Sequence, residues 1–203
     1  MQLFISPTSP YVRKVRVTAH EKGLSDALTT TRCNAYADDP ALLAANPLSR
    51  VPTLVTDDGE ALYDSPVICE WLDRQRAEPC LIPVDGAPRW RVLRGQALAD
   101  GVMDDAVATV LKLRRPETQC DATAIERHLA AVQRAIPAME RERAHWPGAC
   151  SLAHIATACA LTYLDFRLPN LDWRTHAPDL QVWYDDFVQR PAMVATRYEG
   201  ASR

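Results

Sequence analysis

The stretch Ser6-Pro7-Thr8-Ser9-Pro10-Tyr11-Val12 (SPTSPYV) decides how the first part of the chain folds. It follows the apolar run Gln2–Ile5, whose pattern predicts a strand. Ser9 and Pro10 predict a helix start, because a serine side chain accepts an unpaired amide of the first turn and a proline there has no N–H to leave unpaired. Apolar residues then recur at helical spacing until Gly23. The stretch therefore predicts a strand followed closely by a helix.

The same kind of helix start occurs twice more in the first third of the chain. Asp39-Pro40 precedes a short helical segment at 41–46, and Ser65-Pro66 precedes an amphipathic one at 66–76. Strands are predicted at 28–32 and in a hairpin that turns at Asp58-Gly59. Residues 1–77 therefore read as one domain of the order βαβαββα.

The composition changes at EPCLIPVDGAP, residues 78–88, where three prolines and a glycine interrupt the periodic pattern. We interpret this segment as a domain linker. From residue 89 to residue 203, apolar residues recur at helical spacing and no strand is predicted. The fold class is therefore an α/β domain followed by an all-α domain.

Charge and composition exclude several functional classes. The 203 residues carry a net charge of −3, so the chain lacks the positive excess that nucleic-acid binding requires. The sequence has no apolar run of about 18 residues and no N-terminal signal, which favours a cytoplasmic protein without a membrane partner. The six cysteines stand at irregular gaps, which indicates neither a disulfide framework nor a metal site.

The tetrapeptide Ser9-Pro10-Tyr11-Val12 has the form of the redox pattern Cys-Pro-Tyr-Cys, with serine where the attacking thiol would be. With the βαβαββα order of a thioredoxin-like domain and the helical domain after it, the chain resembles the soluble glutathione transferases. The matching stretches, which span nearly the whole chain, are SPTSPYVRKV, NPLSRVPTL, DDGEALYDSPVICEWL and PDLQVWYDDFVQRPAM. The nearest resemblance is to bacterial members with a serine in the first loop, similar to the zeta and theta groups.

The resemblance implies a glutathione site in which the Ser9 hydroxyl is aimed at the glutathione sulfur. A hydroxyl suits this role because it donates a hydrogen bond to a thiolate without losing its own proton. Thr8 and Ser6 are further hydroxyls in the same loop and stay alternatives for this role. Ser9 also has a purely structural interpretation as the cap of the first helix.

The resemblance also implies the rest of the glutathione site. It implies a cis peptide between Val51 and Pro52, with the backbone of Val51 pairing with the cysteinyl part of glutathione. Asp64 and Ser65 are expected to bind the γ-glutamyl ammonium and carboxylate, and a helix N-terminus favours that anion. Arg50 is expected to bind the glycyl carboxylate, or else to be a solvated loop cation.

A small electrophilic, partly apolar second substrate is expected between the two domains, over Tyr11, Met103 and Val107. The apolar stripe that contains Met103 and Val107 has core packing as its alternative interpretation. The resemblance implies sulfur transfer, and isomerisation or dehalogenation by the same thiolate stays open. A non-catalytic regulatory member of the fold is the alternative from another class. Disulfide exchange is disfavoured because Ser9 and Val12 replace both thiols.

Four further expectations remain. The family resemblance implies a homodimer. The dispersed histidines and the irregular spacing of the cysteines predict a protein that uses no metal. The family pattern Ser/Thr-x-x-Asp at a helix start in the second domain reads Ser151-Leu152-Ala153-His154 here, so the reciprocal capping bond is not expected. Arg13 lies where the helix dipole disfavours cations. We interpret Arg13 as the partner of a carboxylate in the helical domain, with a nearby anion as the alternative.

Overall fold

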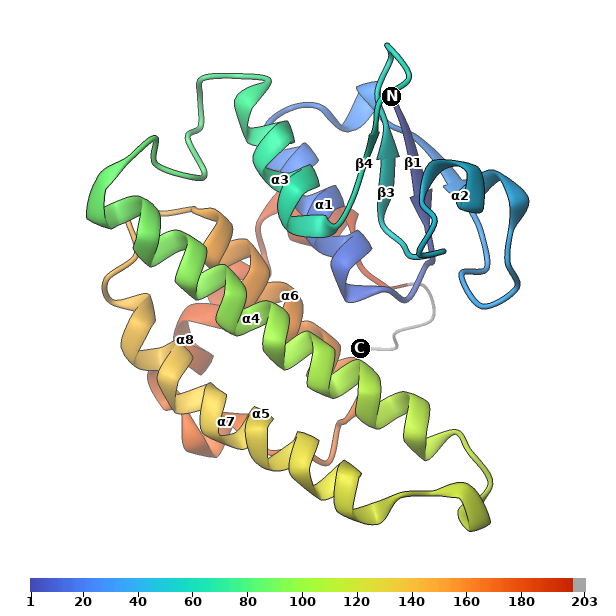
Figure 1. Cartoon of the computed structure of the whole chain (residues 1–203). Helices are drawn as coiled ribbons and strands as arrows, with labels where there is room; N and C mark the ends of the chain where they lie inside the picture. The colour runs from blue at the N-terminus through green and yellow to red at the C-terminus, as the bar shows by residue number, and fades with distance from the viewer. Residues whose placement is uncertain (199–203) are drawn as a thin grey trace. The chain divides into compact units, whose positions relative to one another are not determined.

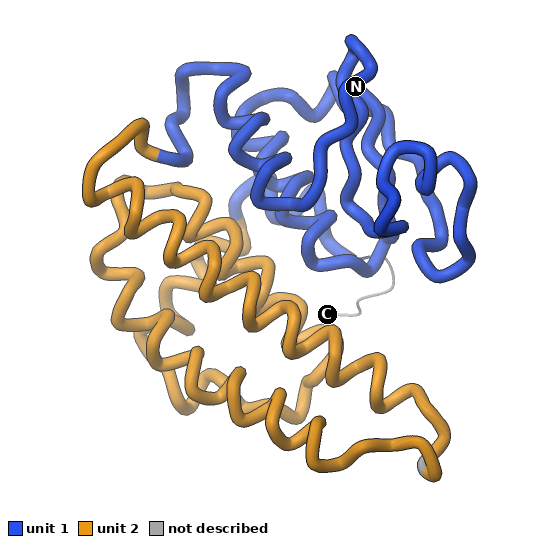
Figure 2. The backbone as a smooth tube through the Cα atoms, viewed as in Figure 1, with its two compact units in different colours: residues 1–82, 190–203 blue, residues 83–189 orange. Residues whose placement is uncertain are grey.

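The computed structural model describes residues 1–198, apart from the side chain at position 117, and divides into two compact units (Figure 2). The first unit consists of residues 1–82 together with the residues from Arg190 onward, and the second of residues 83–189. The last helix, α9 (Pro191–Ala195), contacts α1 (Pro10–Glu21). The end of the described chain therefore groups with the first unit and not with the helices that precede it.

A four-stranded mixed sheet forms the centre of the first unit. The strand order is β2-β1-β3-β4, with β1 parallel to β2 and antiparallel to β3, and with β3 antiparallel to β4. The strands are β1 (Gln2–Ile5), β2 (Thr29–Arg32), β3 (Thr53–Val55) and β4 (Ala61–Leu62). This arrangement confirms the thioredoxin-like order predicted from the sequence.

Helices cover both faces of this sheet. Figure 1 shows α1 and α3 (Ser65–Arg74) on one side and α2 (Pro40–Ala45) on the other, while a 3₁₀ turn, η1 (Ser25–Ala27), leads into β2. Contacts between α1 and α3 fix these two helices side by side. Val15 of α1 and Ile68 of α3 are completely buried. This layer carries the N-termini of both helices to the part of the unit where the site residues lie.

The second unit is entirely helical over its described residues. Its helices are α4 (Gly86–Leu113), α5 (Ala122–Arg143), α6 (Leu152–Arg167), α7 (Trp173–His176) and α8 (Pro178–Phe187), with a 3₁₀ turn, η2 (Glu117–Gln119). Helix α4 packs against both α5 and α6. At Gly95 of α4 an added Cβ would lie 2.8 Å from the Cβ of Ala153. A glycine is therefore required at this close contact of α4 with Ala153 of α6.

The start of α6 corrects the expectation that its reciprocal cap is missing. The Ser151 backbone N–H donates to Nδ1 of His154 at 3.1 Å, and the Ser151 hydroxyl lies 2.8 Å from the same nitrogen. A neutral imidazole has one acceptor nitrogen, and here it takes the place of a carboxylate. The His154 ring is held in this position by Trp146, Trp183 and Phe187, with ring centroids 5.0, 5.7 and 6.1 Å away. Tertiary packing thus completes a cap that the residue type did not predict.

Replacing His154 by alanine should lower the free energy of unfolding by about 2 kcal/mol, because both a capping bond and buried aromatic contacts are lost. Chemical denaturation monitored by circular dichroism would measure this loss. Ser151→Ala serves as the companion variant. Since the two residues share one cap, the double variant should lose clearly less than the sum of the single losses, and strict additivity would contradict the shared cap.

Within residues 1–198, no helix combines the length and the apolarity needed to cross a lipid bilayer.

Candidate functional site

The sheet brings three separate segments to one edge of the first unit. Phe4 of β1 pairs with Thr53 of β3, so the residues just before Thr53 lie beside those that follow β1. Leu54 pairs with Leu62 of β4, so the residues that follow β4 reach the same edge. The loop 6–9, the Val51-Pro52 pair and the Asp64-Ser65 pair therefore leave the sheet together. Both α1 and α3 begin at this edge (Figure 1).

Ser9 is the N-cap of α1. Its hydroxyl oxygen accepts a hydrogen bond from the Val12 backbone N–H at 3.3 Å, and its own N–H donates to the Ser6 carbonyl at 3.2 Å. Accepting the cap bond does not use the hydroxyl proton, so Ser9 can cap the helix and donate to an anion at the same time. The two interpretations of Ser9 are therefore compatible. Thr8 and Ser6 lie in the same partly exposed turn.

The Val51–Pro52 peptide bond is cis, as the family resemblance implies. The loop before it is held by the carbonyl of Arg50, which accepts hydrogen bonds from Asn46 Nδ2 at 3.2 Å and from Thr53 Oγ1 at 2.8 Å. Arg50 itself is an exposed residue. The backbone of this segment is thus fixed, while the role of the Arg50 guanidinium stays a prediction.

Helix α3 begins one residue earlier than the proline pattern predicted. Asp64 occupies the N-cap position and Ser65 is the first helical residue, whereas the sequence analysis took Ser65 as the cap. The Asp64 side chain is exposed and makes no capping bond with any of the described residues. Ser65 is 2% exposed. The helix N-terminus therefore has a carboxylate at its start that capping does not use.

The residues predicted for the second substrate lie in different units. Tyr11, partly exposed, is the second residue of α1, while Met103 is buried in α4 and Val107 lies one turn further along α4. The burial of Met103 fits a core residue as well as a lining residue. Their joint role in binding a second substrate stays a prediction.

The sequence analysis missed Cys33 as a neighbour of this edge. Arg32 of β2 pairs with Ile5 of β1, and the Cys33 backbone N–H donates to the Ile5 carbonyl at 3.0 Å. Burial raises the pKa of the Cys33 thiol, and the charge of Asp39 raises it further. A raised pKa disfavours the thiolate, which is the nucleophilic form of the side chain. Only the parallel pairing of β1 with β2 reveals this position, because no spacing in the sequence predicts it.

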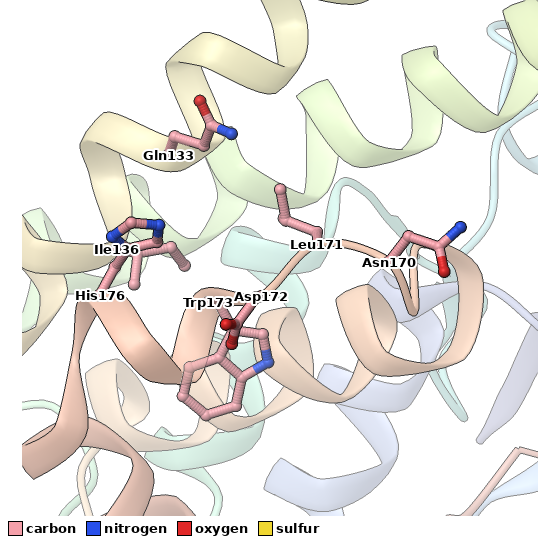
Figure 3. Close-up of a pocket in the computed structure, with 7 residues that line it drawn as sticks. All are labelled: Gln133, Ile136, Asn170, Leu171, Asp172, Trp173 and His176. Atoms are coloured by element: carbon pink, nitrogen blue, oxygen red, sulfur yellow. The ribbon is translucent and has the colours of Figure 1, made fainter.

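A separate cavity of about 220 Å³ lies in the second unit, between α5 and the segment that leads into α7 (Figure 3). Two of its polar side chains, Asp172 and Trp173, are engaged in local structure. Asp172 caps α7, accepting from the Thr175 backbone N–H at 3.2 Å, and the hydroxyl bond from Thr175 lowers the pKa of Asp172. The Trp173 Nε1–H donates to Asp165 at 2.8 Å. This cavity contains none of the predicted site residues.

The described residues contain no group of three or more His, Cys, Asp or Glu side chains that could hold a metal ion. The chemistry that the sheet edge supports is therefore that of hydroxyl groups, backbone amides at two helix N-termini and the Asp64 carboxylate. Such an edge can bind an extended ligand that carries both carboxylate and ammonium groups, and it can stabilise an anion near Ser9.

Comparisons with known proteins agree with this arrangement. Residues 8–75 match the family model of the glutathione S-transferase N-terminal domain, and residues 122–186 match that of the C-terminal domain. The chain is 32% identical over 199 residues to the uncharacterized GST-like protein YibF of Escherichia coli K12, covering 97% of this chain and 98% of YibF. Both domains therefore match in the expected order.

A solved glutathione transferase family member from Pseudomonas fluorescens Pf-5 is 41% identical, with a TM-score of 0.90 over 97% of this chain and 98% of that one. That protein was crystallised with glutathione and also with S-(propanoic acid)-glutathione. Over shorter spans the chain is 36% identical to maleylacetoacetate isomerase of Pseudomonas aeruginosa (94 residues, 45% of this chain and 44% of the isomerase). It is 35% identical to a stringent starvation protein A homolog of Haemophilus ducreyi (97 residues, 48% of this chain and 42% of the homolog). With both domain models and a full-length relative matched, the chain belongs to the glutathione S-transferase family.

Proposed function

We propose that this protein is a glutathione transferase that activates the glutathione thiol for attack on a small electrophile. One observation carries the proposal: the sheet register brings Ser9, Val51-Pro52 and Asp64-Ser65 to one edge beside two helix N-termini. The solved relative that holds glutathione supports the choice of this ligand. Glutathione would enter as a co-substrate and leave as part of the product.

Ser9 would donate a hydrogen bond from its hydroxyl to the glutathione thiolate and keep its own proton. A free thiol titrates near pH ~8.5, and lowering its pKa by two units needs about 2.7 kcal/mol of preferential stabilisation of the anion. A hydrogen bond to a charged group contributes about 1.5–3 kcal/mol, and a helix N-terminus adds about 0.3–1 kcal/mol. The Ser9 hydroxyl and the start of α1 are together sufficient. Thr8 and Ser6 stay alternatives within the same turn.

The remaining predicted residues would hold the peptide part of glutathione. The backbone of Val51, before Pro52, would pair with the cysteinyl unit. Ser65 and the first amides of α3 would receive the γ-glutamyl carboxylate, while the unused carboxylate of Asp64 would receive the ammonium. Arg50 would reach the glycyl carboxylate from its exposed position.

The reaction would form one carbon–sulfur bond. The thiolate supplies the electron pair, and either a halide leaves from the attacked carbon or an activated double bond takes up the electrons and a proton from water. Tyr11, Met103 and Val107 are proposed to contact the second substrate. The relative that binds S-(propanoic acid)-glutathione supports a product in which a short carboxylic acid is attached to the sulfur.

Two other functions follow from the partial matches. The match to maleylacetoacetate isomerase supports glutathione-dependent isomerisation, in which the thiolate adds to a double bond and is later released. The match to a stringent starvation protein A homolog supports a non-catalytic role. The retention of Ser9 with the Asp64-Ser65 pair favours catalysis, because a non-catalytic protein has no need of a group beside the sulfur. We further propose a homodimer, which rests on the family resemblance, and a cytoplasmic location.

Calorimetric titration with glutathione, followed by a conjugation assay with an activated alkene, tests the function. Binding with turnover above the uncatalysed rate is the expected result, whereas binding without turnover of any electrophile would favour the non-catalytic role. Ser65→Ala should weaken glutathione binding about tenfold or more, since a charge-assisted hydrogen bond is lost. Ser25→Ala, in the exposed turn η1, is the matched control and should bind as the wild type does. Equal affinity in Ser65→Ala and the wild type would remove Ser65 from the site.

A further inference from the structure

Arg13 lies one helical turn after Ser9 on α1. Its backbone N–H donates to the Ser9 carbonyl at 3.1 Å, which is the bond of a regular helix between residues four positions apart. Residues four apart lie on the same face of a helix, and long side chains lean toward the helix N-terminus. The guanidinium of Arg13 therefore belongs to the end of α1 where Ser9 lies.

Among the described residues, this guanidinium is buried without a counter-charge. Arg13 is 4% exposed, and its Nη2 donates to the carbonyl of Met193 in α9 at 3.2 Å. The face of the guanidinium lies over the ring of Tyr198, 5.1 Å from the centroid. Within residues 1–198, Nε and Nη1 have no hydrogen-bond partner, so the carboxylate partner expected from the sequence is not found. The three N–H groups on Nε and Nη1 therefore remain to donate.

Lys22, at the other end of the same helix, shows how this fold treats a buried cation that has a structural role. Lys22 is 1% exposed, and its ammonium forms an ion pair with Asp73 at 2.9 Å. It also donates to the carbonyls of Arg76 and Pro79, at 2.6 Å each. A buried charge is strongly destabilising unless it is paired and hydrogen-bonded, and Lys22 satisfies that condition where Arg13 does not. Arg13 therefore has the properties of a ligand-binding residue.

The chemistry of Arg13 points to a carboxylate. A planar guanidinium binds carboxylates through paired, charge-assisted hydrogen bonds, and stacking on an aromatic ring leaves its N–H edge directed outward. The start of α1 also favours an anion. In the proposed function, both carboxylates of glutathione are bound elsewhere, one at Ser65 and one near Arg50. The carboxylate for Arg13 must then come from the other substrate.

We propose that Arg13 binds a carboxylate of the second substrate, so that the substrates of this protein are small electrophilic carboxylic acids. This inference rests on the proposed function, because it requires glutathione to be bound at the same edge. It deepens the proposed function by naming the side chain that would recognise the carboxylate of the second substrate.

Calorimetry with two glutathione conjugates tests the proposal. S-(2-carboxyethyl)glutathione carries the acid, and S-(2-carbamoylethyl)glutathione carries a neutral amide of nearly the same size. The wild type should bind the acid about tenfold more tightly or better, which corresponds to one charge-assisted hydrogen bond. Arg13→Met should abolish this preference while glutathione itself binds as before. Arg16→Met removes a positive charge from the same helix and should keep the preference.

Arg13→Lys provides a second variant in case the methionine variant does not fold. It keeps the charge but not the planar donor set, so the preference for the acid should fall to a few-fold. Thermal unfolding gives a separate readout. Because Arg13→Met removes an unpaired buried charge, its melting temperature without ligand should equal or exceed that of the wild type, and a fall of several degrees would make Arg13 structural.

The remaining outcomes overturn the proposal in distinguishable ways. If the wild type binds glutathione but does not prefer the acid, this inference fails and the proposed function stands. If the wild type does not bind glutathione, both fail. If Arg13→Met weakens the binding of glutathione as much as the binding of the acid conjugate, the carboxylate that Arg13 binds belongs to glutathione. Glu199 follows Tyr198 in the sequence and lies outside the described residues. If only the Glu199→Gln variant prefers the acid conjugate over the amide conjugate, the chain itself supplies the carboxylate that Arg13 binds.

Discussion

Replacing Asp73 by alanine should lower the free energy of unfolding by about 3–5 kcal/mol, the usual cost of removing one partner from a buried ion pair. Asp73 carries more than the charge of Lys22. Its two carboxylate oxygens accept from the backbone N–H groups of Leu81 and Ile82, at 2.9 and 3.0 Å. The substitution leaves a buried ammonium and two buried amides without this acceptor. The substitution therefore removes the hydrogen bonds that connect α3 both to Lys22 at the end of α1 and to the segment of Leu81 and Ile82.

Urea denaturation followed by tryptophan fluorescence would measure this effect, since Trp71 lies in the same helix as Asp73. Arg74→Ala is the matched control. Arg74 is next in the chain, and its pair with Glu70 is long, at 3.8 Å, and exposed. Such a pair contributes at most about 1 kcal/mol. If Asp73→Ala lost no more than the control, the buried network would not be a main support of the first unit.

Replacing Ser9 by alanine should lower turnover by about 10- to 100-fold at saturating glutathione, because the thiolate loses a hydrogen bond worth about 1.5–3 kcal/mol. Affinity for glutathione should change little, since the peptide part is bound elsewhere. The direct measurement is the ultraviolet absorbance of the bound thiolate as a function of pH. In Ser9→Ala its midpoint should rise toward that of a free thiol, about 8.5.

Two further variants control for the dual role of Ser9. Ser9→Thr keeps both the cap and the hydroxyl, so its turnover should stay within a few-fold of the wild type. Thr8→Val removes the neighbouring hydroxyl and should have little effect. The opposite pattern, unchanged turnover in Ser9→Ala with a loss in Thr8→Val, would assign the activating group to Thr8. Circular dichroism must accompany the assay, because loss of an N-cap costs about 0.5–2 kcal/mol of stability.

Much of the candidate site could be predicted because its signals are local. The pairs Ser9-Pro10 and Asp39-Pro40 mark helix starts with residues that lie next to each other in the chain, and the structure begins α1 and α2 at those prolines. The prediction was less accurate at α3. There the cap falls on Asp64, which leaves Ser65 as a buried first residue. Propensity does not distinguish two adjacent residues that can both cap a helix.

His154 shows where residue type misled the sequence analysis. We expected no reciprocal cap at the start of α6, because the residue that usually accepts this hydrogen bond is an acid and His154 is not. That expectation left out the packing of the imidazole against Trp146 of the loop before α6 and against Trp183 and Phe187 of α8. A contact of that kind depends on how the helices pack, and helical periodicity does not specify it.

The sequence by itself determined the order of the strands and helices, the change from an α/β domain to an all-helical one, and the hydroxyl at the start of α1. These depend on hydrogen bonds and apolar spacing within a few residues. The tertiary structure decided which segments meet at the sheet edge, the pairing of Lys22 with Asp73, and the contact of Arg13 with Met193, 180 residues away. Such contacts bring distant residues together through packing and burial, and the free energy of burying a charge depends on the surroundings that the whole fold creates.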